Sequence, residues 1–353
     1  MQISKFAGKA QTVLGLVEGK DLGVTLPHEH LVVDGKAFYA EPSGATNRGL
    51  ADKLVDIGNL SWLRYHPYEN LDNVRLLDEQ EAIDEVMLFK KAGGNTIVDV
   101  TSIGVGRDPK ALARISRAIG LNVIMGAGYY TAPSQSPEMS SKTEEEITEE
   151  IVRDITIGVG DSGICAGIIG EIGGSWPLQD NERKVMRAAA HAQQLTGASI
   201  NIHPGRKTEA PLEIVEILDD AGADLSRVIM SHIDARIRDH SRRCKLAKTG
   251  CSIEYDLWGW EGHFPSYWTA DLLDLPNDTQ RVYEIRQLID EGYLNQILIS
   301  HDICVKSRRV CYGGWGYAHI SNYVVPMMLK RGLTQAQINI IMVENPKRML
   351  CFV

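Results

Sequence analysis

The sequence predicts an α/β protein, a single (β/α)8 TIM barrel over residues 1–353 with its active site at the C-terminal ends of the strands. Two observations lead to this fold. Short apolar or β-branched runs alternate eight times with longer amphipathic stretches, which favours a closed parallel barrel over an open sheet. The cores of these runs, such as residues 96–98 and 297–299, are continuously apolar, as expected for parallel strands covered on both sides.

The predicted strands and helices follow one another in order. Asp108 is an expected N-cap before Pro109, and Gly120 ends that helix. Residues 181–196 and 210–221 have helix-forming composition or helical spacing of apolar residues, and each stretch is followed by a glycine. The eight predicted strands lie at residues 24–33, 95–101, 122–130, 166–173, 199–205, 227–234, 251–259 and 297–303.

Composition limits the possible functions. The chain has 37 Lys and Arg against 46 Asp and Glu, a net charge of −9, which disfavours a nucleic-acid or anionic-membrane partner. It has no uninterrupted apolar run long enough for a membrane span and no apolar signal segment at residues 1–9. Six scattered cysteines without a CxxC pair indicate reduced thiols. We therefore expect a cytoplasmic enzyme with a small-molecule substrate. The sequence does not decide whether it forms a homodimer.

The first sign of chemistry is a His-x-His pair. His28 and His30 lie two apart in the first predicted strand, so their side chains face the same side and can reach one cation, while Glu29 points the other way. Alone, such a pair is a weak signal.

Recurrence of ligand-type residues strengthens the signal, because four further candidates end other predicted strands. All of them fall at the barrel face where enzymes of this fold build their sites, a coincidence that buried core histidines would not explain. Imidazole suits zinc, and a carboxylate can bridge two cations. The sequence therefore predicts two divalent cations per chain, with zinc expected, held by His28, His30, Glu171, His203, His232 and Asp302.

The other histidines are not assigned to the metal site. His301 adjoins Asp302, and only one of two consecutive strand residues can face inward; we choose Asp302. His319 stays unassigned. Surface positions or local hydrogen bonds are expected for His66, His191 and His240.

Each candidate substrate contact can be interpreted in two ways. Arg206 follows His203 by three residues, and its guanidinium could hold a sulfonate or carboxylate or form a surface ion pair. Tyr130 ends the third strand, where its hydroxyl could bond a substrate carbonyl or its ring could pack at the rim. The aromatic-rich residues 258–268 form either a lid over the site or a packed insertion.

Several segments together carry a family resemblance. The segment GVTLPHEH at residues 23–30 resembles the entry motif of the phosphotriesterase branch of the amidohydrolase superfamily, and the order of the ligands matches over essentially the whole chain. The resemblance narrows to the phosphotriesterase-related proteins of animals through QTVLGLVE at 11–18, GIIGEIG at 167–173, IHPGR at 202–206 and VENPK at 343–347.

The resemblance implies a function, and the sequence departs from the bacterial members of the family at one metal ligand. It implies hydrolysis of N-acetyltaurine and related N-acetyl amino acids to acetate and the free amine. A metal-bound hydroxide would attack the amide carbonyl, with Asp302 accepting the proton and passing it on. Bacterial phosphotriesterases bridge their metals with a carboxylated lysine, which Glu171 replaces here, so phosphotriester hydrolysis is in doubt. The alternatives are a lactonase, esterase or weak phosphotriesterase with the same site, and, in another class, a metal-binding scaffold.

Overall fold

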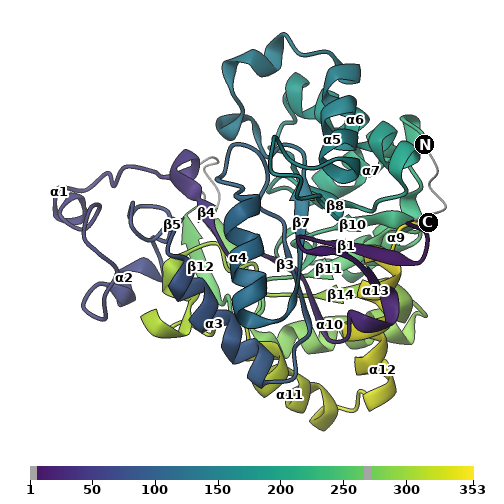
Figure 1. Cartoon of the computed structure of the whole chain (residues 1–353). Helices are drawn as coiled ribbons and strands as arrows, with labels where there is room; N and C mark the ends of the chain where they lie inside the picture. Colours follow the sequence, from purple (N-terminus) through teal and green to yellow (C-terminus); the bar gives the residue numbers. More distant parts are fainter. Residues whose placement is uncertain (1–5, 266–271) are drawn as a thin grey trace.

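Eight parallel strands form one sheet in the computed structural model, which describes residues 6–265 and 272–353 (Figure 1). The first and last strands lie together, because the amide of Asp302 donates to the carbonyl oxygen of His28 at 3.3 Å, so the sheet curls into a barrel. This confirms the predicted fold. In spatial order the strands are β3 (Thr25–Glu29), β6 (Thr96–Asp99), β7 (Asn122–Ala127), β8 (Ile168–Gly173), β9 (Ile200–His203), β10 (Val228–Met230), β11 (Ser252–Tyr255) and β14 (Ile297–Ile299).

Helices surround the strands, and their ends follow the predicted caps. The Asp108 side chain accepts hydrogen bonds from the amides of Lys110 and Ala111, and Gly120 ends the helix with a φ of 64°. The longer helices are α3 (Glu79–Lys91), α4 (Pro109–Ile119), α5 (Glu144–Thr156), α6 (Asp180–Thr196), α7 (Ala210–Asp220), α9 (His240–Ala247) and α10 (Asp278–Asp290). The C-terminal segment adds α11 (Val325–Lys330), α12 (Gln335–Asn339) and α13 (Asn345–Leu350), with π-helical turns at Ile320–Val324 and Ile340–Glu344.

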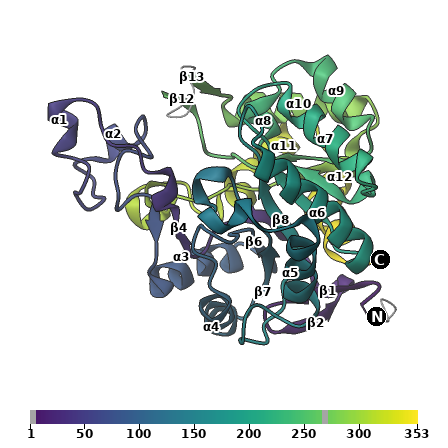
Figure 2. The ribbon, with the colours of Figure 1, turned by 90° about the horizontal axis from the view of Figure 1, so that it is seen from above.

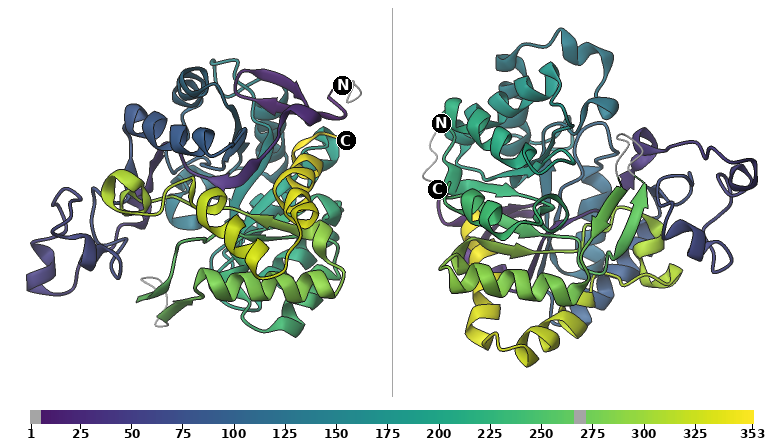
Figure 3. Two further views of the ribbon diagram at one scale, coloured as in Figure 1. Left: turned by 90° about the horizontal axis from the view of Figure 1, so that it is seen from below. Right: turned by 180° about the vertical axis from the view of Figure 1, so that it is seen from behind.

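The core has an inner and an outer part. Inside the barrel, Val98, Ile124, Ile168, Ile229 and Leu298 are fully buried and form one apolar cluster. This cluster continues into the hairpin of β1 (Lys9–Thr12) and β2 (Gly15–Glu18) and into α13, which close the N-terminal end of the barrel. The first and last parts of the described chain meet there, since the amide of Gly8 donates to the carbonyl oxygen of Phe352 at 2.9 Å (Figure 3). The candidate site lies at the opposite, C-terminal end of the barrel.

Three excursions rise from the C-terminal side of the barrel. The longest one, between β3 and β6, contains β4 (Val33–Asp34), α1 (Ala45–Arg48), α2 (Leu60–Leu63) and β5 (Arg75–Leu76), and its tip extends away from the barrel (Figure 2). The second contains α8 (Ile233–Arg236) after β10, and the third contains the hairpin of β12 (Gly262–Pro265) and β13 (Leu272–Leu275) after β11. The excursion between β3 and β6 forms part of the wall around the site.

The aromatic insertion lies only partly within the described residues. Trp258 and Trp260 are 1% and 5% exposed and belong to apolar clusters, so for these two rings the packing interpretation holds. Tyr267 and Trp268 lie outside the described residues. All six cysteines are free thiols. Among the described residues, no helix combines the length and the apolarity needed to cross a bilayer.

The first strand is shorter than predicted. It ends at Glu29, which pairs with Asp99 of β6 after a shift in register between Leu26 and Glu29. His30 therefore lies just beyond the strand. Glu29 does point away from His28, yet it is fully buried and accepts hydrogen bonds from Ser300, His301 and Ile303, which fastens the end of β14 to β3.

Candidate metal centre

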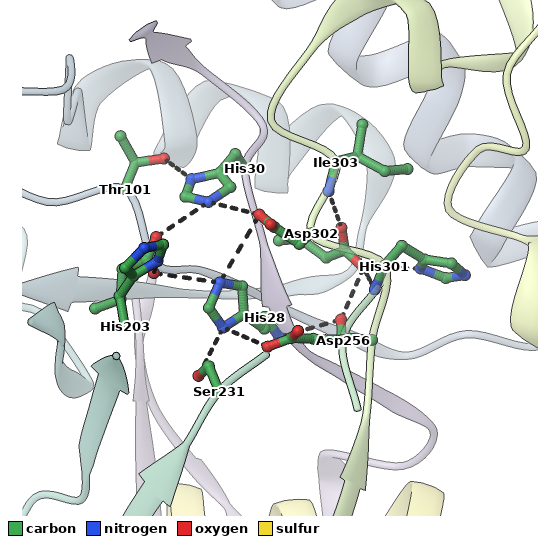
Figure 4. A network of polar contacts seen from close by, with 12 residues as sticks. His28, His30, Thr101, His203, Ser231, Asp256, His301, Asp302 and Ile303 are labelled. Atoms are coloured by element: carbon green, nitrogen blue, oxygen red, sulfur yellow. Dashed lines mark hydrogen bonds and ion pairs between the residues drawn. The ribbon is translucent and has the colours of Figure 1, made fainter. Parts of the chain in front are cut away.

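The six predicted ligands lie together at the C-terminal end of the barrel. Each lies in the last part of a strand or within three residues after it, and Figure 4 shows His28 between His30, Asp302 and Ser231. His28 Nε2 lies 3.6 Å from Glu171 Oε2 and 3.9 Å from Asp302 Oδ1. Four of the six side chains are at most 5% exposed, whereas His203 is 15% and Asp302 13% exposed, so these two open toward solvent.

Glu171 lies between two groups of imidazoles. Its Oε1 is 3.4 Å from His30 Nε2, whereas its Oε2 is 3.0 Å from His203 Nδ1 and 3.6 Å from His232 Nε2. One carboxylate thus turns one oxygen to each group. This is the arrangement that a carboxylate bridging two cations requires.

Donor atoms close enough to share a cation form three sets among the described residues, and His28 belongs to all of them. The first is His28, His30 and Asp302, the second is His28, Glu171 and His232, and the third is His28, Glu254 and Asp256. His203 adds to the second set, since its Nδ1 is 2.8 Å from His232 Nε2. Imidazole nitrogens and carboxylate oxygens are the donors that zinc and related cations take.

A further set of residues fixes the imidazole rings from behind. His28 Nδ1 lies 3.1 Å from Glu254 Oε2 and 3.2 Å from Ser231 Oγ, and His30 Nδ1 lies 2.8 Å from Thr101 Oγ1. In His232, Nδ1 is 2.8 Å from Asp256 Oδ1. Holding one ring nitrogen in this way presents the other to a cation, which is the usual arrangement around metal-ligating histidines.

An unpartnered nitrogen of His28 is a second reason why these residues suit a cation. Nε2 of His28 is buried and has no hydrogen-bond partner among the described residues, although its Nδ1 has two. A buried polar atom without a partner costs free energy, which a metal ion at that position would remove. The residues present therefore suit a resident metal.

Electrostatics divide the imidazoles of the site, because burial lowers their pKa values while neighbouring carboxylates raise the pKa of His30 to about 10 and that of His232 to about 9. Burial and the neighbouring imidazole of His232 lower the pKa of His203 to about 3, so its ring stays neutral and retains a lone pair. Burial opposes ionisation of Asp302, but the hydrogen bond from His30 and the nearby imidazoles outweigh it and lower its pKa. Burial and the carboxylates of Glu171 and Asp302 raise the pKa of Tyr130, so the phenol keeps its proton.

A cavity of about 860 Å³ opens over these groups. Its floor includes His30, Glu171, His203 and Asp302. The volume is within the range of small-molecule sites.

Both predicted substrate contacts line this cavity. Tyr130 Oη lies 2.9 Å from His203 Nδ1, and the Arg206 guanidinium lies 6.0 Å from the centre of the Tyr68 ring. The structure thus brings Arg206 and Tyr130 to the site.

Comparison with known proteins agrees with this geometry. The Phosphotriesterase family model matches residues 8–350. The phosphotriesterase-related protein of Nematostella vectensis is 47% identical, with 98% of this chain and 99% of the relative covered. The chain belongs to the phosphotriesterase family.

Two further relatives of this phosphotriesterase-family chain refine the picture. The N-acetyltaurine hydrolase of Xenopus tropicalis is 44% identical, covering 99% of this chain and all of the relative. Among solved structures, the resiniferatoxin-binding protein from Rhodobacter sphaeroides superposes with a TM-score of 0.93 at 35% identity, covering 97% and 95% of the two chains. Family membership and these relatives make the chain a metal-dependent hydrolase of the barrel fold.

Of the adjacent pair in this family member, Asp302 faces the site and His301 does not. His301 Nδ1 lies 2.8 Å from Glu29 Oε1, its Nε2 accepts from the amide of Ile320, and Figure 4 shows its ring turned away from His28. Sequence reasoning missed Glu254 and Asp256. Their signal was present, because two carboxylates two residues apart in a predicted barrel strand face the same side.

Proposed function

We propose that the chain holds two divalent cations, zinc being the metal its ligands suit, and hydrolyses small N-acyl compounds. N-acetyltaurine and related N-acetyl amino acids would give acetate and the free amine. The observation that carries the two-cation centre is the position of Glu171, with one oxygen toward His30 and the other toward His203 and His232. The relatives named N-acetyltaurine hydrolase support the substrate class.

The proposed roles divide the residues by position. His28, His30 and Asp302 hold one cation, His203 and His232 hold the other, and Glu171 bridges them. Cations bound there would supply a hydrolytic nucleophile at neutral pH and polarise the scissile carbonyl.

Asp302 is placed for proton transfer. Its carboxylate lies 3.2 Å from His30 Nε2, lines the cavity and is partly exposed, so it faces both the metal ligands and a bound substrate. Asp302 would take a proton from the nucleophile and deliver it to the leaving amine, which needs a carboxylate that starts ionised, in keeping with its lowered pKa.

Arg206 and Tyr130 would bind the substrate on either side of its carbonyl. The Tyr130 hydroxyl keeps its proton and lies against His203, where it can donate a hydrogen bond to the carbonyl oxygen. The Arg206 guanidinium lines the same cavity and can hold a sulfonate or carboxylate tail. Such a tail would fix the amide over the metal ligands and contribute to rate through orientation.

A substrate panel combined with elemental analysis tests this function. Protein purified without chelator should contain about two divalent cations per chain and should turn over N-acetyltaurine with a higher kcat/KM than a lactone or a phosphotriester. Removing the metal with a chelator should abolish turnover, and adding zinc back should restore it. Metal-free active protein would contradict the metal centre. Fast lactone or phosphotriester hydrolysis with slow amide hydrolysis would contradict the substrate assignment.

A further inference from the structure

The strand ladder of the barrel has a gap between β3 and β14. Parallel pairing joins every other neighbouring pair of barrel strands among the described residues, whereas the paired order begins at β14 and ends at β3. A backbone bond from the amide of Asp302 to the carbonyl oxygen of His28 crosses this gap, and at 3.3 Å it is long for its kind. The gap separates two ligand-bearing segments, with His28 and His30 on one side and Asp302 on the other. The contacts across it therefore set the geometry of one cation position.

The side chain of Glu29 also crosses this gap. Glu29 is the middle residue of the His-x-His pair and is fully buried. Its Oε1 accepts hydrogen bonds from Ser300 Oγ at 2.7 Å and from the amide of His301 at 2.8 Å, and its Oε2 accepts from the amide of Ile303 at 3.0 Å. One carboxylate of β3 thus holds the backbone after β14 at two points.

The ring of His301 is a further donor to Glu29. Its Nε2 accepts from the amide of Ile320 at 3.1 Å, so the ring proton is on Nδ1, which lies 2.8 Å from Glu29 Oε1. Glu29 is the acceptor in all four of these side-chain contacts. A carboxylate can accept at both oxygens, whereas a glutamine side chain would turn an NH2 group toward some of the donors.

The two amides that Glu29 holds lie on either side of Asp302, and Figure 4 shows His301 and Ile303 next to it. Asp302 has a φ of 51°, a left-handed conformation that non-glycine residues seldom adopt. Such a backbone persists where the surroundings fix it. In this conformation Asp302 Oδ1 lies 3.2 Å from His30 Nε2. The contacts to Glu29 therefore help to hold the Asp302 carboxylate beside the imidazoles of β3.

We propose that Glu29 is a positioning residue for Asp302. By holding the amides of His301 and Ile303 across the gap, it sets the direction in which the Asp302 carboxylate faces the other ligands and a bound substrate. This inference rests on the proposed function, in which Asp302 holds a cation and transfers the proton. Glu29 is not among the described residues that line the cavity, so its effect reaches the reaction through the backbone of Asp302.

Glu29→Gln tests this role in the metal-loaded enzyme. The glutamine has the same size but opposes some of the donors, so the backbone at Asp302 should shift. We expect kcat for N-acetyltaurine to fall about 10–100-fold, because a small displacement of a reacting group can cost a factor of this size. KM should change less than kcat, since Arg206 and Tyr130 are untouched. A kcat equal to that of the parent enzyme would overturn the proposal.

Glu85→Gln is the matched control. Glu85 is 3% exposed and accepts from the amides of Val310 and Cys311 at 2.9 and 2.8 Å, so it also holds loop backbone with both carboxylate oxygens. It is not among the described residues that line the cavity. This substitution should lower Tm about as much as Glu29→Gln and leave kcat nearly unchanged. Equal losses of kcat in the two variants would overturn the positioning role.

Glu29→Asp keeps two acceptor oxygens on a shorter side chain. It cannot reach both amides at their present distances, so kcat should fall, but less than in Glu29→Gln. This variant decides the question alone if the glutamine variant fails to fold. A parent-like kcat in Glu29→Asp would then overturn the proposal.

A cobalt spectrum reports the arrangement of the ligands without any substrate. Cobalt(II) takes the same imidazole and carboxylate ligands as zinc, and its visible absorption changes with their geometry. In cobalt-loaded protein, Glu29→Gln should shift the spectrum, and Glu85→Gln should leave it as in the parent. An unchanged spectrum in Glu29→Gln would overturn the proposal.

The two readouts separate this inference from the function beneath it. A parent enzyme that binds cobalt but does not hydrolyse N-acetyltaurine would contradict the proposed substrate, and a spectral shift in Glu29→Gln would still support the positioning role. Turnover by the parent with an unchanged spectrum and kcat in Glu29→Gln would remove the positioning role alone. A parent protein that binds no cation would remove both.

Discussion

Asp256 holds His232 at two points. Its Oδ1 lies 2.8 Å from the ring Nδ1 of His232, and its two carboxylate oxygens accept from the backbone amide of His232 at 3.1 and 3.0 Å. His232 has a φ of 58°, and with Asp302 at 51° it is one of two non-glycine residues with positive φ among those described. Such backbone costs of order 1–3 kcal/mol and persists where the surroundings fix it. Asp256 supplies part of that fixation.

Replacing Asp256 by Ala should therefore weaken metal binding. The His232 ring would lose the partner that presents Nε2 to the cavity, and loss of such a partner typically costs about 10–100-fold in metal affinity. Chelator titration followed by elemental analysis should show the cation near His203 and His232 lost first. Asp220→Ala is the control, an exposed carboxylate at the end of α7. Unchanged metal affinity in Asp256→Ala would show that His232 is held well enough by the backbone alone.

Glu171→Ala should remove the bridge between the proposed cations. We expect metal content to fall below two per chain and turnover of N-acetyltaurine to be lost, since both cation positions use one oxygen of this carboxylate. Glu171→Lys offers a rescue arm, because carbon dioxide can carboxylate a lysine at this position and bicarbonate should then raise activity. Normal metal and turnover in Glu171→Ala would disprove the bridging assignment.

The sequence predicted which candidate ligands lie together better than it predicted the residues that support them. His28, Glu171 and His203 could be found because the strand ends of a barrel converge on one face. Residues of metal-ligand type recurred near the ends of several predicted strands, and this recurrence indicated a shared site. The spacing of Glu254 and Asp256 indicated that they share one face of a strand, but sequence gives no distance from Glu254 to His28. The register shift in β3 between Leu26 and Glu29 also escaped prediction, since register depends on how two strands pair rather than on either one.

The cavity walls were beyond sequence reasoning for a related reason. Val33, Val74 and Val105 are far apart in the chain and each is an ordinary apolar residue. They line the cavity together only because backbone hydrogen bonds join their segments.

Asp302→Asn should keep much of the metal and lose most of the turnover. An amide oxygen can still contact a cation, but the amide cannot accept a proton, and general acid–base contributions are typically ~10²–10⁴-fold. Steady-state kcat and metal content would be measured together. His301→Asn is the comparison, because His301 faces Glu29 rather than the cavity and should affect stability more than proton transfer. A loss below about tenfold in Asp302→Asn would point to another proton acceptor.

Arg206→Ala should damage activity on anionic substrates selectively. The guanidinium lines the cavity and lies over the Tyr68 ring, so its charge faces the space where the amine part of the substrate would extend. N-acetyltaurine and the neutral N-acetylethanolamine share an acyl group and differ in the charge of the tail, which isolates this contact. A hydrogen bond to a charged group contributes about 1.5–3 kcal/mol, so kcat/KM for N-acetyltaurine should fall roughly 10–150-fold while the neutral amide changes little.

Arg206→Lys should recover part of the loss, since a lysine keeps the charge but not the bidentate geometry. Arg242→Ala, a half-exposed arginine on α9, should leave both substrates unaffected. Equal losses on the charged and neutral amides would place Arg206 in a structural role and leave the anionic tail without its binding group.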